Sequence, residues 1–224
     1  MLLLFVVELF YFSFNSAGAE LEKSPITEID LNFLHENLKY KSVNGEDRIY
    51  TGNNDSIKLT EAASGIQSVL PILIPILHRR TSTEHRSFVI EEPELNLFPL
   101  AQYELIKHLE SSRPEVIWED YGTIHTYTTH SPYILSALNN LLFANKVKTT
   151  TRSELEERID EIIPTDINPY YFTAYQICAG TAKPIFNRES GLIDDNYIDN
   201  ASDKMGDDFD ALMELMDKNR QPVS

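Results

Sequence analysis

A short apolar run that ends in two acids and a proline places the strongest constraint on this fold. The run is Ser87-Phe88-Val89-Ile90, followed by Glu91-Glu92-Pro93. Continuous apolar runs of this length are typical of buried parallel strands, and α/β proteins bind ligands beyond the carboxyl ends of such strands. We therefore expect a strand that delivers two carboxylates to a ligand-binding edge. Acids that merely solvate the end of a strand would give the same bare pattern.

The segments around this run alternate between strand and helix patterns. Apolar spacing predicts helices at 21–38, 64–78, 99–111, 132–142 and 153–163, the last with a Ser153 cap. Pro71 and Pro75 should kink or split the second of these helices. Further strands are expected at 87–90, 123–128, 142–144, 170–178 and 183–186. This order predicts an α/β fold with a mainly parallel sheet.

Two regions should depart from that α/β core. Between residues 40 and 59, turn chemistry at Asn44-Gly45-Glu46-Asp47 and at Gly52-Asn53-Asn54-Asp55 separates short β-like runs. This spacing predicts a small antiparallel hairpin or meander. A turn at Ala179-Gly180 should separate two later strands. At the other end, residues 194–217 predict one or two acidic helices.

Charge and cysteine content limit the possible partners. The formal net charge is −16, and the segment from Glu189 to Asp217 holds ten acids and one base, a net −9. Such a segment is usually a solvated face, and it argues against direct binding of a phosphate backbone. We expect DNA contact only through a partner. Cys178 is the only cysteine, which excludes an intrachain disulfide and fits a cytoplasmic protein.

The first 14 residues, MLLLFVVELFYFSF, allow two interpretations. A small-residue stretch at 17–19 follows them, which is a pattern of secretory signal peptides. However, no Lys or Arg precedes the apolar run, Glu8 lies within it, and it is too short to span a membrane. We favour a buried strand or helix of a domain whose earlier part lies outside this sequence, and we expect no membrane partner.

Two further motifs flank the acidic strand. The first, Ala63-Ser64-Gly65-Ile66-Gln67, puts a serine and a glycine at the start of a predicted helix, where free N–H groups favour an anionic phosphate. Ser64 could equally be a plain N-cap. The second, Thr129-His130-Ser131-Pro132, follows the strand predicted at 123–128, and His130 could also be an ordinary loop histidine. We assign no role to His125 or Tyr127.

Together with Ile90-Glu91-Glu92-Pro93-Glu94-Leu95-Asn96-Leu97-Phe98-Pro99, these motifs resemble the ABC-type ATPase heads of the SMC/RecF/OLD-like branch. The order signature, Walker B, D-loop and switch histidine is the order of that family, and the resemblance covers residues 38–143 firmly. It implies part of a P-loop NTPase domain that uses ATP and Mg²⁺. Ile66 stands where transporters of the wider family have a second glycine.

The resemblance also implies roles for individual residues. Glu92 takes the general-base position, and Glu91 takes the magnesium position, through water, where Asp is usual. His130 takes the position that contacts the γ-phosphate, and residues 96–99 take that of the D-loop at a dimer interface. Three residues correspond to the part of the signature that contacts the γ-phosphate of the opposite subunit: Ser64, Gly65 and Gln67.

One part of the family's nucleotide site is missing from the sequence. No GxxxxGK[ST] phosphate-binding loop, the Walker A motif, occurs among the 224 residues. We therefore expect a single, N-terminally truncated domain over 1–224 that hydrolyses ATP only when a Walker A segment is supplied in trans. The resemblance implies a homodimer or paired head, a role in DNA repair or phage defence, and a nuclease or other effector as partner. The alternative is an inert interaction module left from a truncated ATPase.

Overall fold

The computed structural model describes residues 26–52, 55–79, 86–113, 123–151, 155–194 and 197–220. Its strands are β1 (Glu28–Asp30), β2 (Leu38–Val43), β3 (Glu46–Thr51), β4 (Asp55–Lys58), β5 (Arg86–Glu91), β6 (Thr123–Thr128), β7 (Tyr175–Cys178), β8 (Thr181–Pro184), β9 (Phe186–Asn187) and β10 (Leu192–Ile193). Its helices are η1 (Leu59–Glu61), α2 (Ser64–Arg79), α3 (Pro99–Ser111), α4 (Pro132–Thr150), α5 (Glu156–Ile162), η3 (Pro169–Tyr171) and α6 (Tyr197–Arg220). The predicted α/β class is confirmed, and the described strands form one parallel pair together with antiparallel sheets.

The antiparallel region forms a four-stranded sheet in the order β1-β2-β3-β4. Asn44 and Gly45 connect β2 to β3, with φ of 53° and 79°. An Asn-Gly pair with positive φ at both positions is the favoured two-residue hairpin connection, because its twist matches that of the strands. The meander predicted between residues 40 and 59 is therefore confirmed.

The helix predicted at 21–38 is wrong for the part that the structure describes. Residues 28–30 form β1, which pairs with β2. Ile29 and Leu31 are buried two residues apart, which is the period of a strand. Asp30 then accepts a hydrogen bond from the Asn32 backbone N–H at 2.8 Å. This local bond turns the chain and prevents helical continuation.

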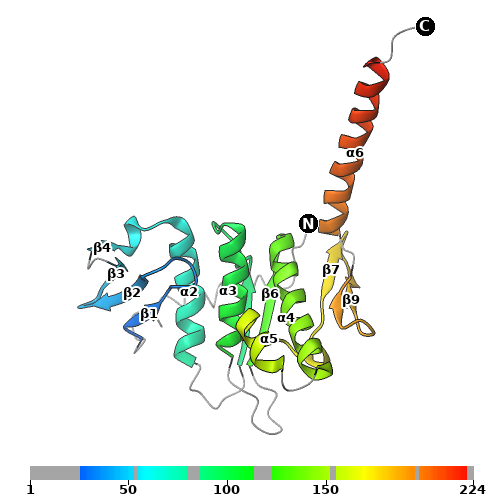
Figure 1. Ribbon diagram of the computed structural model, residues 1–224. Coiled ribbons are helices and arrows are strands. Elements are labelled where there is room, and N and C mark those ends of the chain that lie inside the picture. The colour runs from blue at the N-terminus through cyan, green and yellow to red at the C-terminus, as the bar shows by residue number, and fades with distance from the viewer. Residues whose placement is uncertain are drawn as a thin grey trace.

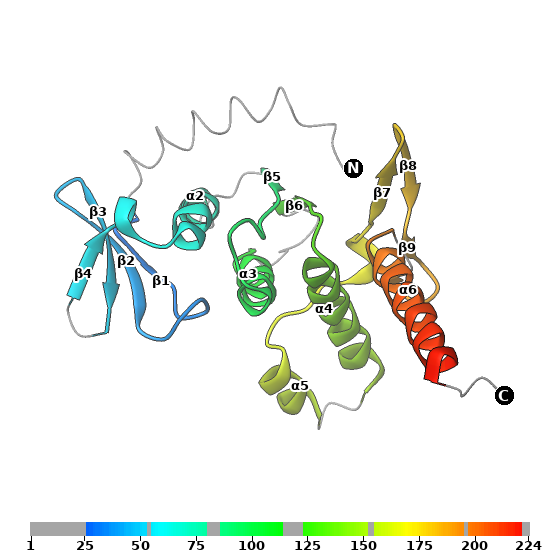
Figure 2. The same cartoon turned by 90° about the horizontal axis from the view of Figure 1, so that it is seen from above.

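The parallel part of the fold consists of β5 and β6, which pair from Arg86↔Thr123 to Glu91↔Thr128. Seen from above, helices α2, α3 and α4 lie side by side, and α3 and α4 cover one face of this pair (Figure 2). α2 runs unbroken from Ser64 to Arg79 although it contains Pro71 and Pro75. The expected division of this helix into two pieces is therefore wrong.

The strand predicted at 142–144 is also wrong, because these residues belong to α4. Buried residues recur along this helix at spacings of three and four: Ile134, Ala137, Leu138, Leu141, Leu142 and Ala144. That spacing buries one helical face and extends the predicted helix to Thr150. Our prediction ended the helix eight residues too early.

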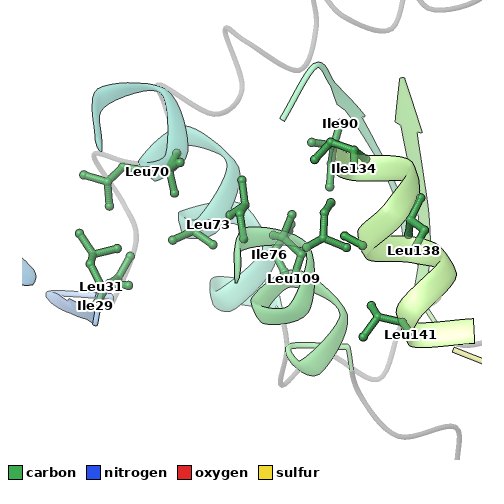
Figure 3. Packing of buried hydrophobic residues seen from close by; sticks show 14 of the residues in the cluster. Ile29, Leu31, Leu70, Leu73, Ile76, Ile90, Leu109, Ile134, Leu138 and Leu141 are labelled. Carbon is green, nitrogen blue, oxygen red and sulfur yellow. The ribbon is translucent and has the colours of Figure 1, made fainter. Parts of the chain in front are cut away.

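A single apolar core joins the two regions of sheet through the helices. Figure 3 shows side chains of α2, α3 and α4 meeting, with Leu73 and Ile76 near Leu109, and Ile90 near Ile134. Several of these side chains are completely buried, so their positions fix how the helices stand against β5 and β6. The core thereby sets the edge at which both parallel strands end.

The C-terminal part adds small antiparallel pairs and one long helix. Ala179 and Gly180, with φ of 50° and 76°, connect β7 to β8 at the predicted turn. α6 then projects away from the other elements (Figure 1). Within the described ranges, no helix has the length and apolarity needed to cross a bilayer. Residues 1–25, on which the signal-peptide alternative depends, and Ser153 lie outside the described residues.

Candidate active site

The two parallel strands end side by side and carry the predicted site residues at one edge. Glu91 and Thr128 are partners in the last pair of the ladder, and the Glu92 N–H donates to the Thr128 carbonyl at 2.8 Å. Ile90 is buried against the helices. Because side chains alternate along a strand, Glu91 lies on the opposite face of β5 from Ile90.

Glu92 and His130 meet directly beyond this edge. His130 Nε2 lies 3.2 Å from Glu92 Oε1, and the side chains are 46% and 29% exposed. The Glu92 backbone has φ 42°, a left-handed conformation that non-glycine residues rarely adopt. Such strain costs on the order of 1–3 kcal/mol and is concentrated at functional sites. The structure thus brings the predicted base and the predicted switch histidine into contact.

The loop after Glu92 packs against the start of α2. A Cβ on Gly65 would lie 2.8 Å from the Asn96 carbonyl oxygen and 2.9 Å from Leu97 Cδ2, so only glycine allows this approach. Asn96, with φ 62°, also donates from its side-chain amide to Ser68 Oγ at 2.9 Å. Gly65 therefore has a role inside this chain: it lets the loop that begins at Glu92 rest on α2.

The other two signature residues, Ser64 and Gln67, differ in whether the side chain is hydrogen-bonded within this chain. Ser64 is exposed, but it is the first residue of α2 and not its cap, since the Ala63 carbonyl already accepts from the Gln67 backbone N–H. The N-cap interpretation of Ser64 is therefore wrong. The Gln67 side-chain amide donates to the Ala62 carbonyl at 2.7 Å. Gln67 thus holds the turn before α2, while the Ser64 hydroxyl remains at the surface.

Glu94 links the acidic loop to the histidine loop, and sequence reasoning assigned it no role. Its Oε1 accepts hydrogen bonds from Thr129 Oγ1 at 2.6 Å and from the His130 backbone N–H at 2.9 Å. Its other oxygen, Oε2, is buried and receives no hydrogen bond from the residues that the structure describes. Glu94 therefore fixes the backbone of His130 relative to the loop that carries Glu92.

A second chain of buried polar groups reinforces the same corner. The Ser131 hydroxyl donates to Gln102 Oε1 at 2.5 Å, and Gln102 Nε2 donates to the Leu97 carbonyl at 2.9 Å. Ser131 Oγ also accepts from the Tyr133 N–H and caps α4. The Ser-Pro pair before a helix is the sequence signal that could have identified Ser131 as a cap. No comparable signal marks Gln102.

A group of four interacting polar residues, Glu110, Arg113, His125 and Tyr127, lies between α3 and β6. Glu110 Oε1 accepts from the Tyr127 hydroxyl at 2.6 Å and lies 3.2 Å from His125 Nδ1. Arg113 binds the other oxygen at 2.9 Å. Burial alone would raise the pKa of Glu110, but the hydrogen bond from His125 and the charge of Arg113 lower the pKa below its ordinary value. Burial and the nearby Glu110 charge raise the pKa of Tyr127. These contacts tie α3 to β6.

The chemistry of this edge fits a magnesium nucleotide only in part. Glu91 offers a carboxylate, the ligand type that Mg²⁺ prefers. Among the described residues, no group of three His, Cys, Asp or Glu side chains could hold a metal alone. Magnesium would therefore share its ligands with phosphates and water, as is usual for this ion. The phosphate-binding loop itself is not among the 224 residues.

Comparisons with known proteins give a family and a distant structural similarity. The sequence profile of a family described as an AAA ATPase domain matches residues 13–135, more than half of the chain. No curated protein matches. A solved chain from work on the ATP-driven dimerization and DNA-stimulated activation of SMC ATPases is 9% identical, with 97% of this chain and 99% of that chain covered and a TM-score of 0.40.

Proposed function

This chain belongs to the AAA ATPase domain family, and from that premise we propose that it supplies the hydrolytic part of an ABC-type ATP site. The observation that carries the proposal is the 3.2 Å contact between Glu92 and His130 at the carboxyl edge of β5 and β6. A carboxylate and an imidazole held together at a partly exposed edge are the groups that proton transfer to and from water requires.

Glu92 acts as the general base in this proposal. Its carboxylate accepts a proton from the water that attacks the terminal phosphate, and its 29% exposure leaves room for that water. Without nucleotide, His130 donates to this carboxylate and holds its orientation. Since 46% of the His130 side chain is exposed, the imidazole can turn toward a phosphate while Glu94 holds its backbone.

Magnesium and the phosphates complete the site. Glu91 would hold Mg²⁺, directly or through water, and the bound ion would neutralise charge on the phosphates. The phosphate cradle comes from a GxxxxGK[ST] loop outside this sequence. The signature residues act across a dimer, and only one of them contacts the nucleotide. Ser64 presents its hydroxyl to the nucleotide of the opposite subunit, while Gly65 and Gln67 shape the turn that positions it.

The loop after Glu92 serves as a dimer interface in this proposal. Three large apolar side chains are exposed here, Leu95 and Phe98 in the loop and Leu100 at the start of α3. The Phe98 side chain is 85% exposed. Exposing so large an apolar side chain to water does not stabilise an unpaired head, and exposed apolar patches often mark protein–protein interfaces. A paired head covering this loop would bury these side chains next to Glu92. DNA repair or phage defence, with a nuclease as effector, remains the process proposed by resemblance.

The test combines this chain with a polypeptide that carries a GxxxxGK[ST] loop and measures phosphate release from ATP. Hydrolysis should require both chains. Glu92→Gln should lower the rate at least about 100-fold while ATP affinity, measured by calorimetry, changes less than about threefold. Glu104→Gln is the matched control, because Glu104 is a carboxylate on α3 paired with Lys107.

Two results would refute the proposal in different ways. Undiminished hydrolysis by the Glu92→Gln variant would remove Glu92 from the mechanism. Stable association of the two chains without any ATP binding would identify an inert interaction module instead.

Phe98→Ser tests the proposed interface. It should weaken the nucleotide-dependent pairing of heads, which sedimentation with and without ATP measures.

A further inference from the structure

α6 carries a wide apolar stripe that nothing in the described chain covers. Every side chain from Asp203 to Met216 is exposed. The large apolar ones are Met205 (65%), Phe209 (63%), Leu212 (65%), Met213 (41%), Leu215 (62%) and Met216 (42%). Figure 1 shows the helix pointing away from the other elements. A long helix without packing on an apolar face is only marginally stable in water.

The stripe has the spacing of a helix that pairs with another helix. Met205, Phe209, Leu212 and Met216 follow one another at intervals of four, three and four, which is the repeat of paired helices. Met213 and Leu215 flank this seam and widen it. The apolar side chains therefore form one continuous face, instead of being scattered around the helix.

The charges of α6 leave this seam free for self-association. Four acids lie on the opposite side of the helix at the same four-three-four spacing: Asp203, Asp207, Asp210 and Glu214. Asp208 lies nearer the seam, but Lys204 forms an ion pair with it at 2.5 Å. Two copies of α6 can therefore meet along the seam without bringing unpaired like charges together.

From these features we propose that α6 pairs with α6 of a second copy of this chain, independently of nucleotide. The exposed fractions of the six side chains amount to on the order of 600 Å² in each copy, close to the roughly 800 Å² per partner of a stable interface. Monomers rarely expose a contiguous apolar patch of more than a few hundred Å². Pairing through α6 would keep two heads at high effective concentration before ATP binds.

Sedimentation velocity of the full chain without nucleotide tests the proposal. The wild-type chain should be dimeric, and Leu212→Glu should weaken the dimer at least about tenfold. Ala211→Glu is the matched control, because it adds the same charge one residue away and outside the seam, and it should leave the dimer unchanged. Phe209→Ser removes the apolar contact without adding charge and should also weaken the dimer. Circular dichroism verifies that each variant stays folded.

The response of the dimer to salt is a second test of self-pairing. Each copy carries a net −16, so raising NaCl from about 50 to about 500 mM should tighten the dimer by screening repulsion between copies. A wild-type chain that is monomeric throughout this range would overturn the proposal. So would a nucleotide-free dimer that dissociates in Phe98→Ser and persists in Leu212→Glu, because the interface would then be the loop beside Glu92. Neither outcome bears on the role of Glu92 in hydrolysis.

Discussion

Replacing Glu94 with alanine tests whether this side chain ties the loop that carries Glu92 to the loop that carries His130. The substitution removes hydrogen bonds from Thr129 Oγ1 at 2.6 Å and from the His130 N–H at 2.9 Å. Bonds to a charged acceptor contribute about 1.5–3 kcal/mol each. Against this, the buried Oε2 has no hydrogen-bond partner among the described residues, and removing it relieves about 1–3 kcal/mol of desolvation cost. The expected net loss of stability is about 3 kcal/mol.

Urea denaturation of wild-type and Glu94→Ala chains measures this loss, and amide hydrogen exchange reports on the loop itself. The His130 amide should lose protection in the variant, because its acceptor is gone. Glu104→Ala is the matched control: its ion pair with Lys107 is partly exposed and should be worth less than about 1 kcal/mol. Equal stability of Glu94→Ala and wild type, with unchanged exchange at His130, would refute the reasoning.

Three further substitutions test packing at Gly65, helix stability at Gly206 and the pH dependence of stability at Glu110. Gly65→Ala should destabilise the chain by about 1–3 kcal/mol in urea denaturation, since its Cβ would overlap the Asn96 carbonyl. The Cβ added by Gly206→Ala would meet no atom within 4 Å. Because alanine favours a helix over glycine by about 1 kcal/mol, this variant should show a stronger helical signal in circular dichroism. The pKa of Glu110 is lower in the folded chain than its ordinary value of 4.5. Its carboxylate therefore stabilises the fold fully at pH values above 4.5, and this stabilisation is lost as the pH falls through the lower pKa of the folded chain. Denaturation midpoints should therefore fall in that acid range for the wild type, and less steeply for Glu110→Gln.

Sequence patterns predicted the elements around the site well where local signals were strong. The helix at 99–111 and the strand at 123–128 have the predicted bounds, because Pro99 marks a helix start and a compact β-prone run marks the strand. The error at 21–38 arose because apolar residues at mixed spacings fit both a helix and a strand. The pairing of β1 with β2 decided between them, and it leaves Ile29 and Leu31 buried. That pairing is tertiary and leaves no local signal.

The candidate site was predicted in part. Motif order identified Glu92 and His130, which the structure brings together. Glu94, by contrast, acts through residues 35 and 36 positions later in the chain, and no spacing rule connects them. The sequence pattern also pointed to Gly65 as a phosphate contact, whereas the structure adds a packing role against Asn96. Tertiary approach of two loops explains both differences.

The shared edge of β5 and β6 also determines where the chain tolerates a change of length. Glu92 stands one residue beyond the Glu91↔Thr128 pair, and His130 stands two beyond it. One inserted residue between Thr128 and Thr129 would move the histidine by about 3.3 Å and displace both partners of Glu94, Thr129 and His130. An insertion at Asn44-Gly45 would change only the tip of a hairpin far from this edge. Lineages of this domain should therefore vary in length at the hairpin and stay constant in length after the parallel strands.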